Sequence, residues 1–148
     1  MSVSFLNLIP IKPNFVPSGP MQEKGKVFLK NIFLGEETEF ITTDGIEFID
    51  QGENFKNVSC NLCNQIIEIE FWQTQMNKCY EKHFNDLAFT TECCKKQTTL
   101  NDLIYNSPAG FGRFVIKIRN PEKDMDVKQI KELEVILGVN IRQIWAHY

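Results

Sequence analysis

The stretch FGRFVIKIRN, residues 111–120, carries the clearest secondary-structure signal of the chain. From residue 113 to residue 119 every second side chain is apolar and those between are basic except for Val115, which is the period of a β-strand with one buried face. The apolar positions are Phe114, Ile116 and Ile118, and the basic positions are Arg113, Lys117 and Arg119. This alternation predicts a half-buried strand with a basic outer face.

The residues after this strand carry the signals of a helix. Asp126, followed three residues later by Gln129, resembles a capping box at a helix start. Apolar residues then recur at helical spacing, and Gly138 is suited to end the helix; the apolar positions are Val127, Ile130, Leu133 and Leu137. The closing stretch VNIRQIWAHY, residues 139–148, reads as a last strand. The C-terminal part therefore predicts a strand–helix–strand unit.

The first 50 residues repeat this order. A short strand is expected over residues 4–9, because Pro10 ends the apolar run. Ser18 can cap a helix that has Pro20 in its first turn and that Gly35 can stop. Its expected apolar side consists of Val27, Phe28 and Ile32. The stretch EFITTDGIEFIDQ, residues 39–51, then indicates a strand, a turn at Asp44 and Gly45, and a second strand.

Two strand–helix–strand halves predict an α+β fold, the ferredoxin-like β-α-β-β-α-β sandwich, in which two helices cover one face of an antiparallel sheet. The halves are separated by a segment over residues 51–110 that holds all five cysteines. We therefore expect a single domain over residues 1–148, with a cysteine-bearing, zinc-ribbon-like insertion between its second and third strands.

Composition limits the classes of function. The chain has 148 residues, of which 43% are hydrophobic, and a net charge of −3 with a pI near 5.4. A general nucleic-acid binder normally has a basic surplus, because its affinity comes from neutralising phosphates. We find neither a targeting signal nor an apolar stretch of the ~18 residues that would span a bilayer. A cytoplasmic location and no membrane partner are expected, and cysteines in a reducing compartment favour metal binding over disulfides.

The motif SCNLCNQ, residues 59–65, contains Cys60-x-x-Cys63. Two thiolates at this spacing can bind one ion from a tight turn, and zinc prefers four such soft ligands in a closed structural site. A redox pair is the alternative, but thioredoxin-like pairs lie at a helix start after a strand, whereas polar residues lead into this motif as a loop. The sequence offers two ways to complete the site. One is Cys79 with His83, four residues apart on a predicted helix, and the other is the adjacent pair Cys93 and Cys94.

Each of these pairs has an alternative interpretation. Cys79 and His83 fall on one apolar helical stripe, where a cysteine is more simply a core residue; the other members are Ile69, Trp72 and Met76. Cys93 and Cys94 follow a predicted strand, and both can face one ion only where the chain turns. The polar residues after them indicate such a turn. We therefore favour the ligand set Cys60, Cys63, Cys93 and Cys94, with mixed sets using Cys79 or His83, or no metal, as alternatives.

Three long stretches resemble a family of small, functionally uncharacterised bacterial proteins. They are FIDQGENFKNVSCNLC (48–63), TTECCKKQTTLNDLIYNSPAGFGRFVIKIRNP (90–121) and LGVNIRQIWAHY (137–148). Members of this family pair a CxxC with a later CC, followed by an LNDL…PAGF stretch, and the resemblance runs from about Pro10 onward. It implies that the four favoured cysteines form one zinc-ribbon-like set. Proline and glycine usually flank these cysteines, whereas this chain has Asn61, Asn64, Glu92 and Lys95 there.

Three functions are compatible with these features. We expect a metal-stabilised module that binds a protein partner and is not an enzyme, because the sequence holds no catalytic constellation. The first alternative is a nucleic-acid-associated zinc protein that uses the basic strand face, with Arg142 joining it from the last strand. The second is an enzyme with a zinc or cysteine centre, which would need a metal position open to water or an activated thiol.

Overall fold

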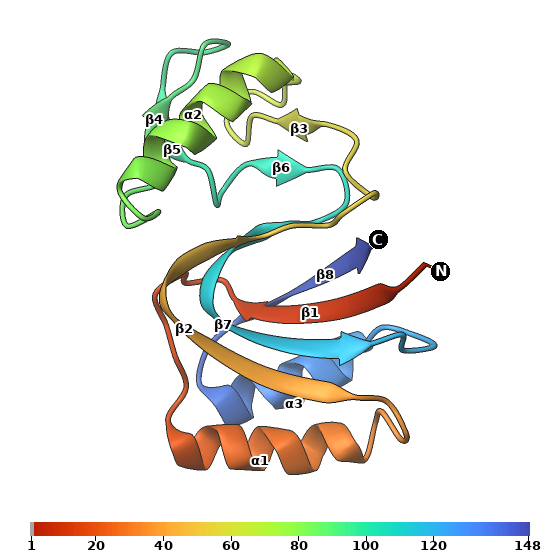
Figure 1. Cartoon of the computed structure of the whole chain (residues 1–148). Coiled ribbons are helices and arrows are strands. Elements are labelled where there is room, and N and C mark those ends of the chain that lie inside the picture. The colour runs from red at the N-terminus through yellow and green to blue at the C-terminus, as the bar shows by residue number, and fades with distance from the viewer. Residues whose placement is uncertain (1) are drawn as a thin grey trace.

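The computed structural model describes residues 2–148, a mixed α+β fold whose main sheet has four strands. The strands are β1 (Ser4–Pro10), β2 (Thr38–Ile49), β7 (Gly110–Arg119) and β8 (Ile141–His147). They lie in the order β2-β7-β1-β8, and each neighbouring pair is antiparallel. Figure 1 shows this sheet between two helices on one side and the cysteine-bearing segment on the other.

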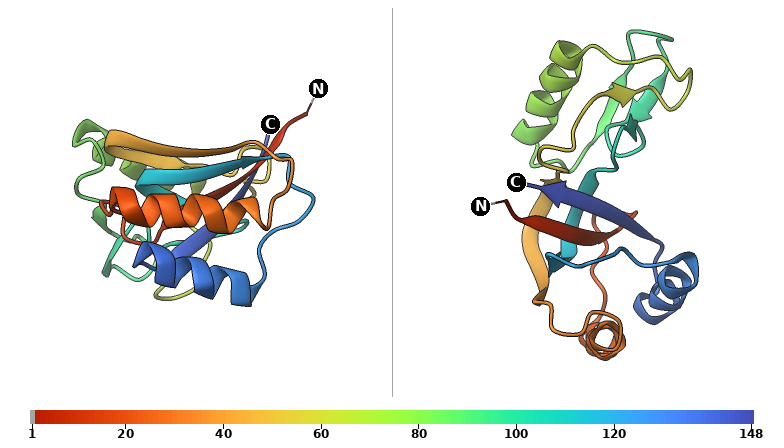
Figure 2. Two further views of the ribbon diagram at one scale, coloured as in Figure 1. Left: turned by 90° about the horizontal axis from the view of Figure 1, so that it is seen from below. Right: turned by 90° about the vertical axis from the view of Figure 1, so that its right-hand side faces the viewer.

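The alternation predicted for β7 is confirmed. Phe114, Ile116 and Ile118 are at most 1% exposed and lie in one apolar cluster with residues of both helices. Figure 2 shows helices α1 and α3 side by side beneath the sheet. The predicted strands 4–9 and 139–148 are confirmed as β1 and β8, within a few residues.

Helix α3 (Val127–Leu137) has the predicted boundaries. The Asp126 side chain accepts from the Gln129 N–H while the Gln129 side chain accepts from the Asp126 N–H, which confirms the capping box. Gly138 ends the helix with a φ of 75°, a left-handed conformation that glycine adopts without strain.

Helix α1 (Gly19–Lys30) begins where predicted but ends five residues before Gly35. The helix closes in a tighter turn, in which the backbone N–H groups of Asn31 and Ile32 bond to the carbonyls three residues before them. Phe33, directly after this turn, is buried in the core. The expected apolar side was wrong at Val27, which is 64% exposed. Gly25 and Leu29 are the buried positions of this helix, and a Cβ at Gly25 would lie 3.3 Å from Leu137. Gly25 thus allows α1 to approach α3 closely.

The turn predicted at Asp44 and Gly45 is wrong, because β2 is one continuous strand of 12 residues. Its pairing with β7 shifts register between Thr42 and Glu47, so the extra residues form a bulge. A bulge bends a strand without reversing it. Beyond this point β2 and β7 continue together toward the cysteine-bearing segment (Figure 1).

The cysteine-bearing segment contains one helix and four short strands. Its elements are β3 (Val58–Ser59), α2 (Ile69–Glu81), β4 (Ala88–Thr90), β5 (Gln97–Thr99) and β6 (Ile104–Tyr105). Strand β3 pairs with β6 and β4 pairs with β5. Its apolar cluster is rich in aromatic rings, and Phe48 of β2 contacts both Trp72 and Phe111 at centroid distances of 5.9 and 5.0 Å. The core of the segment is therefore continuous with the ends of β2 and β7.

A polar joint also fixes this segment to the sheet. Arg142 Nη1 of β8 donates to the carbonyl oxygens of Asn101 and Ala109 at 3.2 and 2.9 Å. Asn101 Oδ1 accepts from the Phe111 N–H, and Asn101 Nδ2 donates to the Ile11 carbonyl. These contacts give the LNDL and PAGF stretches a shared structural role. Within residues 2–148, none of the helices combines the length and hydropathy needed to cross a bilayer.

Candidate metal centre

Two turns of the same form face each other in the cysteine-bearing segment. In the first, the Cys60 N–H bonds to the Gln65 carbonyl at 2.8 Å, and Asn64 has a φ of 64°. In the second, the Thr91 N–H bonds to the Lys96 carbonyl at 3.0 Å, and Lys95 has a φ of 56°. Each turn thus spans six residues and has a left-handed residue at its fifth position.

The comparison of the two turns explains the adjacent cysteines. The first turn has cysteines at its first and fourth positions, Cys60 and Cys63. The second has Thr91 at its first position and Cys94 at its fourth, and Cys93 supplies the additional thiol. The Thr91 hydroxyl lies 3.1 Å from Cys94 Sγ. Sequence spacing alone did not reveal this correspondence, because the threonine breaks the second CxxC.

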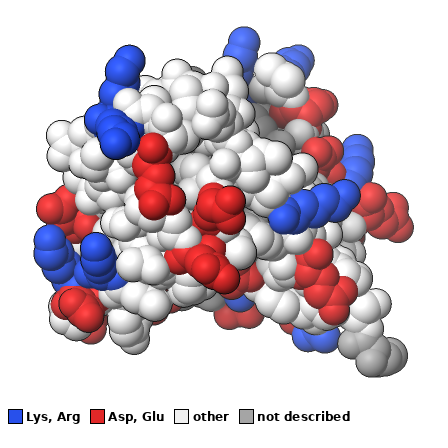
Figure 3. Space-filling model, turned by 90° about the horizontal axis from the view of Figure 1, so that it is seen from above, with Lys and Arg blue, Asp and Glu red and all other residues white. Residues whose placement is uncertain are grey.

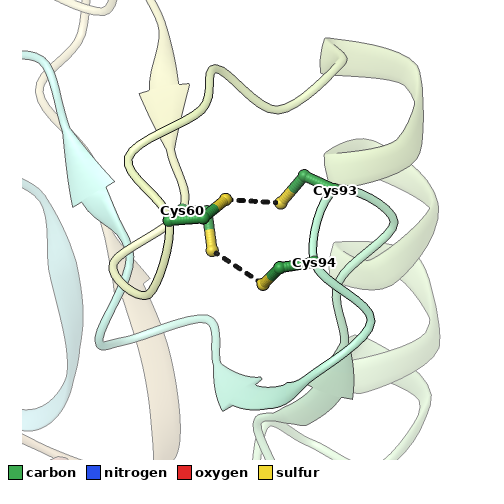
Figure 4. Close-up of side chains that lie close together, drawn as sticks. Cys60, Cys93 and Cys94 are labelled. Atoms are coloured by element: carbon green, nitrogen blue, oxygen red, sulfur yellow. Dashed lines mark hydrogen bonds between the residues drawn. The ribbon is translucent and has the colours of Figure 1, made fainter.

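The structure brings the four favoured cysteines together. Their sulfur atoms all lie within 4.8 Å of one another. Cys63 Sγ is 3.3 Å from Cys93 Sγ, and Cys60 Sγ is 3.8 Å from Cys94 Sγ. Figure 4 shows the Cys93 and Cys94 side chains pointing toward the turn that carries Cys60. Four sulfurs at about 2.3 Å from a tetrahedral ion would be separated by about 3.8 Å, so these four thiols can hold a metal ion with little movement.

The surroundings of the cluster favour ionisation at one thiol and oppose it at another. Burial disfavours the Cys60 thiolate, but hydrogen bonds from the backbone N–H groups of Leu62 and Cys63 and from neighbouring thiols outweigh it and lower the pKa to about 7. At Cys63 the Gln65 N–H favours the thiolate, yet the crowded thiols, Cys93 first, and burial raise its pKa to about 12. Such crowding of potential negative charges is relieved by a cation.

Each cysteine comes from a turn anchored in the apolar cluster of the segment. Cys60 is fully buried, whereas Cys63, Cys93 and Cys94 pack at the edge of this cluster. Cys60 follows β3 and the second pair follows β4, so the cluster joins two parts of the segment that lie about 30 residues apart in sequence. An ion held there would cross-link the segment.

Neither Cys79 nor His83 belongs to this group. Cys79 is 4% exposed and lies in the apolar cluster, where burial first of all raises the pKa of its thiol. This confirms the interpretation of Cys79 as a core residue. The predicted stripe was wrong at both ends, because Ile69 is 49% exposed and His83 lies beyond the end of α2.

The chain matches no protein-family model, and comparisons with curated proteins and with solved structures found no similar chain.

Proposed function

We propose that Cys60, Cys63, Cys93 and Cys94 bind one structural zinc ion and that the protein acts as a metal-stabilised module for binding another protein. The observation that carries this proposal is the gathering of four thiols from two turns within 4.8 Å. Four soft thiolates in a tetrahedral arrangement are the donor set that structural zinc prefers. A site closed by four protein ligands leaves no position for water or substrate, which favours a structural role over a catalytic one.

The arrangement of the sheet supports the ferredoxin-like assignment. In order of sequence, the four main strands are β1, β2, β7 and β8, and they lie side by side as second, third, first and fourth. Helices α1 and α3 cover one face. We propose that this is a ferredoxin-like sandwich in which residues 51–110 form a zinc-ribbon-like insertion, and that the chain belongs to the bacterial family it resembles.

An exposed apolar surface on the insertion supports protein binding. Ser59 pairs with Ile104 on one side and with Ile66 on the other, which places these two isoleucines across one short sheet. Ile66 is 67% exposed and Ile104 is 48% exposed. Leu62, between the two cysteines of the first turn, is 47% exposed. Exposed aliphatic residues of this kind mark protein interaction sites when they are grouped.

The basic strand face gives less support to nucleic-acid binding. Arg142 is turned inward to the carbonyls of the joint, and Arg113 Nε donates to the Thr43 carbonyl at 3.1 Å. Lys117 Nζ lies 4.8 Å from the centroid of the Phe5 ring. On the side of the molecule where the cysteine-bearing segment lies, seen from above in Figure 3, acidic side chains lie near the middle and basic ones mostly toward the periphery. A phosphate backbone would instead be matched by a contiguous basic surface.

The metal content of purified protein tests this proposal. Protein without a metal-binding tag should contain one zinc per chain by elemental analysis. Replacing Cys93 and Cys94 with serine should remove the zinc, whereas the matched pair Cys79→Ser with His83→Ala should keep it. Zinc lost only from the second variant would move the site to α2, and wild-type protein without zinc would refute the proposal.

The protein-binding part has its own test. The variant Ile66→Asp with Ile104→Asp should lose a partner that binds the wild type directly, as measured by calorimetry with the purified partner. Val135→Asp is the matched control, since Val135 is 83% exposed on α3 and far from the insertion in sequence. Equal binding by both variants would exclude this surface.

A further inference from the structure

A second candidate site lies on the face of the main sheet that points away from α1 and α3. A cavity of about 200 Å³ is lined there by residues of β1, β2 and β7, and by Asp50 and Tyr148, which directly follow β2 and β8. Apolar walls come from Ile41 and Val115, and Tyr148 lies at the C-terminal end. The cavity involves none of the four clustered cysteines, so it is independent of the metal centre.

Asn7 in the middle of this lining is unusual. It is 4% exposed, and its neighbours across the sheet are Lys117 on β7 and Ile144 on β8. Leu6 and Leu8 belong to the apolar cluster between the sheet and the helices. The side chain of Asn7, between them in the strand, therefore points to the opposite face, where the cavity lies. The Asn7 Oδ1 atom is buried and has no hydrogen-bond partner among the described residues.

A buried acceptor without a donor is costly, and such groups in folded proteins call for an explanation. Lys117, the neighbour of Asn7 across the sheet, does not supply the missing donor, because its ammonium group lies over the Phe5 ring. Nothing about β1 requires an amide at this position, since the next residue on the same face, Ile9, is apolar and fully buried. An N–H or O–H donor from a ligand would satisfy Asn7.

The charges around the cavity indicate what kind of ligand fits. Two acidic residues, Glu47 and Asp50, and two basic residues, Arg113 and Lys117, line it. Glu47 pairs across the sheet with Gly112, the residue before Arg113. Asp50 accepts from the Tyr148 hydroxyl at 2.6 Å, which holds this carboxylate in place. The balance of charges matches a neutral ligand that carries one charge of each sign.

We propose that this cavity binds a small zwitterion of the free α-amino-acid class. The ammonium group of the ligand would donate an N–H to Asn7 Oδ1 and lie near the carboxylates of Glu47 and Asp50. The carboxylate of the ligand would lie near Lys117 and Arg113. The volume is below the ~300–1,000 Å³ of pockets for drug-sized ligands, which excludes a nucleotide. The apolar walls of Ile41 and Val115 leave room for a short side chain.

The test uses wild-type protein and the twenty standard L-amino acids as probes, each up to 20 mM. At least one should raise the melting temperature by a few degrees at saturation and give a binding isotherm by calorimetry. The N-acetyl and methyl ester derivatives of that amino acid each lack one charge, and each should bind about tenfold more weakly or worse. An unaltered affinity for either derivative would overturn the zwitterion assignment.

Variants then locate the site. Asn7→Leu keeps the shape of the side chain and removes the orphaned acceptor, so the unliganded protein should be at least as stable as wild type, whereas affinity should fall about tenfold or more. Lys117→Met should weaken binding similarly, while Lys128→Met on the exposed side of α3 should not. Absence of binding by every probe, or wild-type affinity in Asn7→Leu and Lys117→Met, would overturn the proposal.

Discussion

The main sheet and the cysteine-bearing segment are stabilised by different kinds of contact. The sheet has strands of 7 to 12 residues and buries its apolar side chains beneath two helices. The segment has strands of only 2 or 3 residues. Such short ladders contribute little by themselves. The segment depends instead on an aromatic cluster and, on our account, on an ion that joins its two turns.

If the four cysteines bind an ion as proposed, the two regions draw on different sources of stability, and each source can be removed separately. The two tryptophans give each region its own probe, because Trp72 lies in the cluster of the segment and Trp145 packs against the core of the sheet. Variants that retain a single tryptophan, Trp145→Phe or Trp72→Phe, can therefore report on each region separately. Away from the joint between the two regions, a substitution that affects only one probe would sharpen the comparison, and a substitution that affects both probes equally would break it.

The largest effect is expected from Cys60→Ser. Loss of one thiolate should abolish stoichiometric zinc binding, and structural zinc contributes about 10–16 kcal/mol in small zinc-dependent peptides. We expect the emission of Trp72 to shift to longer wavelength while that of Trp145 stays unchanged. Cys79→Ser is the control that should keep the zinc. A red shift of both tryptophans in Cys60→Ser would show that the regions are not independent.

Phe114→Ala should reduce the stability of the sheet by about 3–5 kcal/mol, because it removes a fully buried ring. The Phe114 ring also contacts Phe40 edge-to-face at a centroid distance of 5.9 Å. Urea unfolding followed by Trp145 fluorescence measures this effect. The exposed position Ile104 provides the control, where alanine should change stability by less than about 0.5 kcal/mol. A small loss in Phe114→Ala would contradict the placement of the sheet core.

Gly110→Ala tests the joint between the two regions. A Cβ at this position would lie 2.8 Å from Arg142 Nη1 and 2.8 Å from Ile9 Cδ1. Overpacking of this kind costs about 1–3 kcal/mol, and unfolding curves should show the loss with both tryptophan probes. Gly45→Ala is the matched control, because a Cβ there would meet no atom within 4 Å. Equal stability of the two variants would mean that the joint is looser than the structure shows.

Metal affinity should fall as the pH is lowered, because only thiolates bind the ion. Cys60, with a pKa of about 7, is largely ionised at pH 8, whereas the raised pKa of Cys63 leaves its thiol protonated there. Metal binding therefore releases protons. For each proton released, the apparent affinity for the metal falls about tenfold for each unit by which the pH is lowered. Competition with a chromophoric chelator from pH 8 to pH 6 measures this slope. An affinity independent of pH would exclude thiolate ligation.

The smallest effect is expected from Asp126→Ala at the start of α3. Removing this cap should cost about 1 kcal/mol, seen as a modest shift of the urea midpoint with zinc content unchanged. Asp124→Ala, two residues earlier and exposed, should leave the midpoint in place. Loss of zinc in Asp126→Ala would show that α3 and the cysteine-bearing segment are coupled, and would contradict their separate stabilisation.

Much of the sheet half was predictable because its signals are local. The alternation in β7 and the capping box of α3 follow from side chains a few residues apart, and both are confirmed. The end of α1 was not, because it depends on Phe33 reaching the core. The predicted turn at Asp44 and Gly45 failed for a similar reason, since continued pairing with β7 makes those residues a bulge.

The candidate site was predictable in its members but not in its form. The pairs Cys60 with Cys63 and Cys93 with Cys94 were visible in the sequence, and the structure places all four together. The equivalence of the two turns was hidden, because Thr91 stands where a second CxxC would have a cysteine. The role proposed for Asn7 could not be predicted from the sequence. An isolated asparagine in a strand becomes a candidate binding residue only when the structure shows its side-chain oxygen to be buried without a partner.

Hydrogen exchange followed by mass spectrometry, on the zinc-loaded protein and on protein treated with a strong chelator, measures whether the metal holds the cysteine-bearing segment together. We expect that removing the metal abolishes protection in α2 and in the two cysteine turns, while β1, β7 and β8 keep theirs. Protection unchanged in the turns, or lost equally from the sheet, would contradict the claim that a metal at the four cysteines holds this segment.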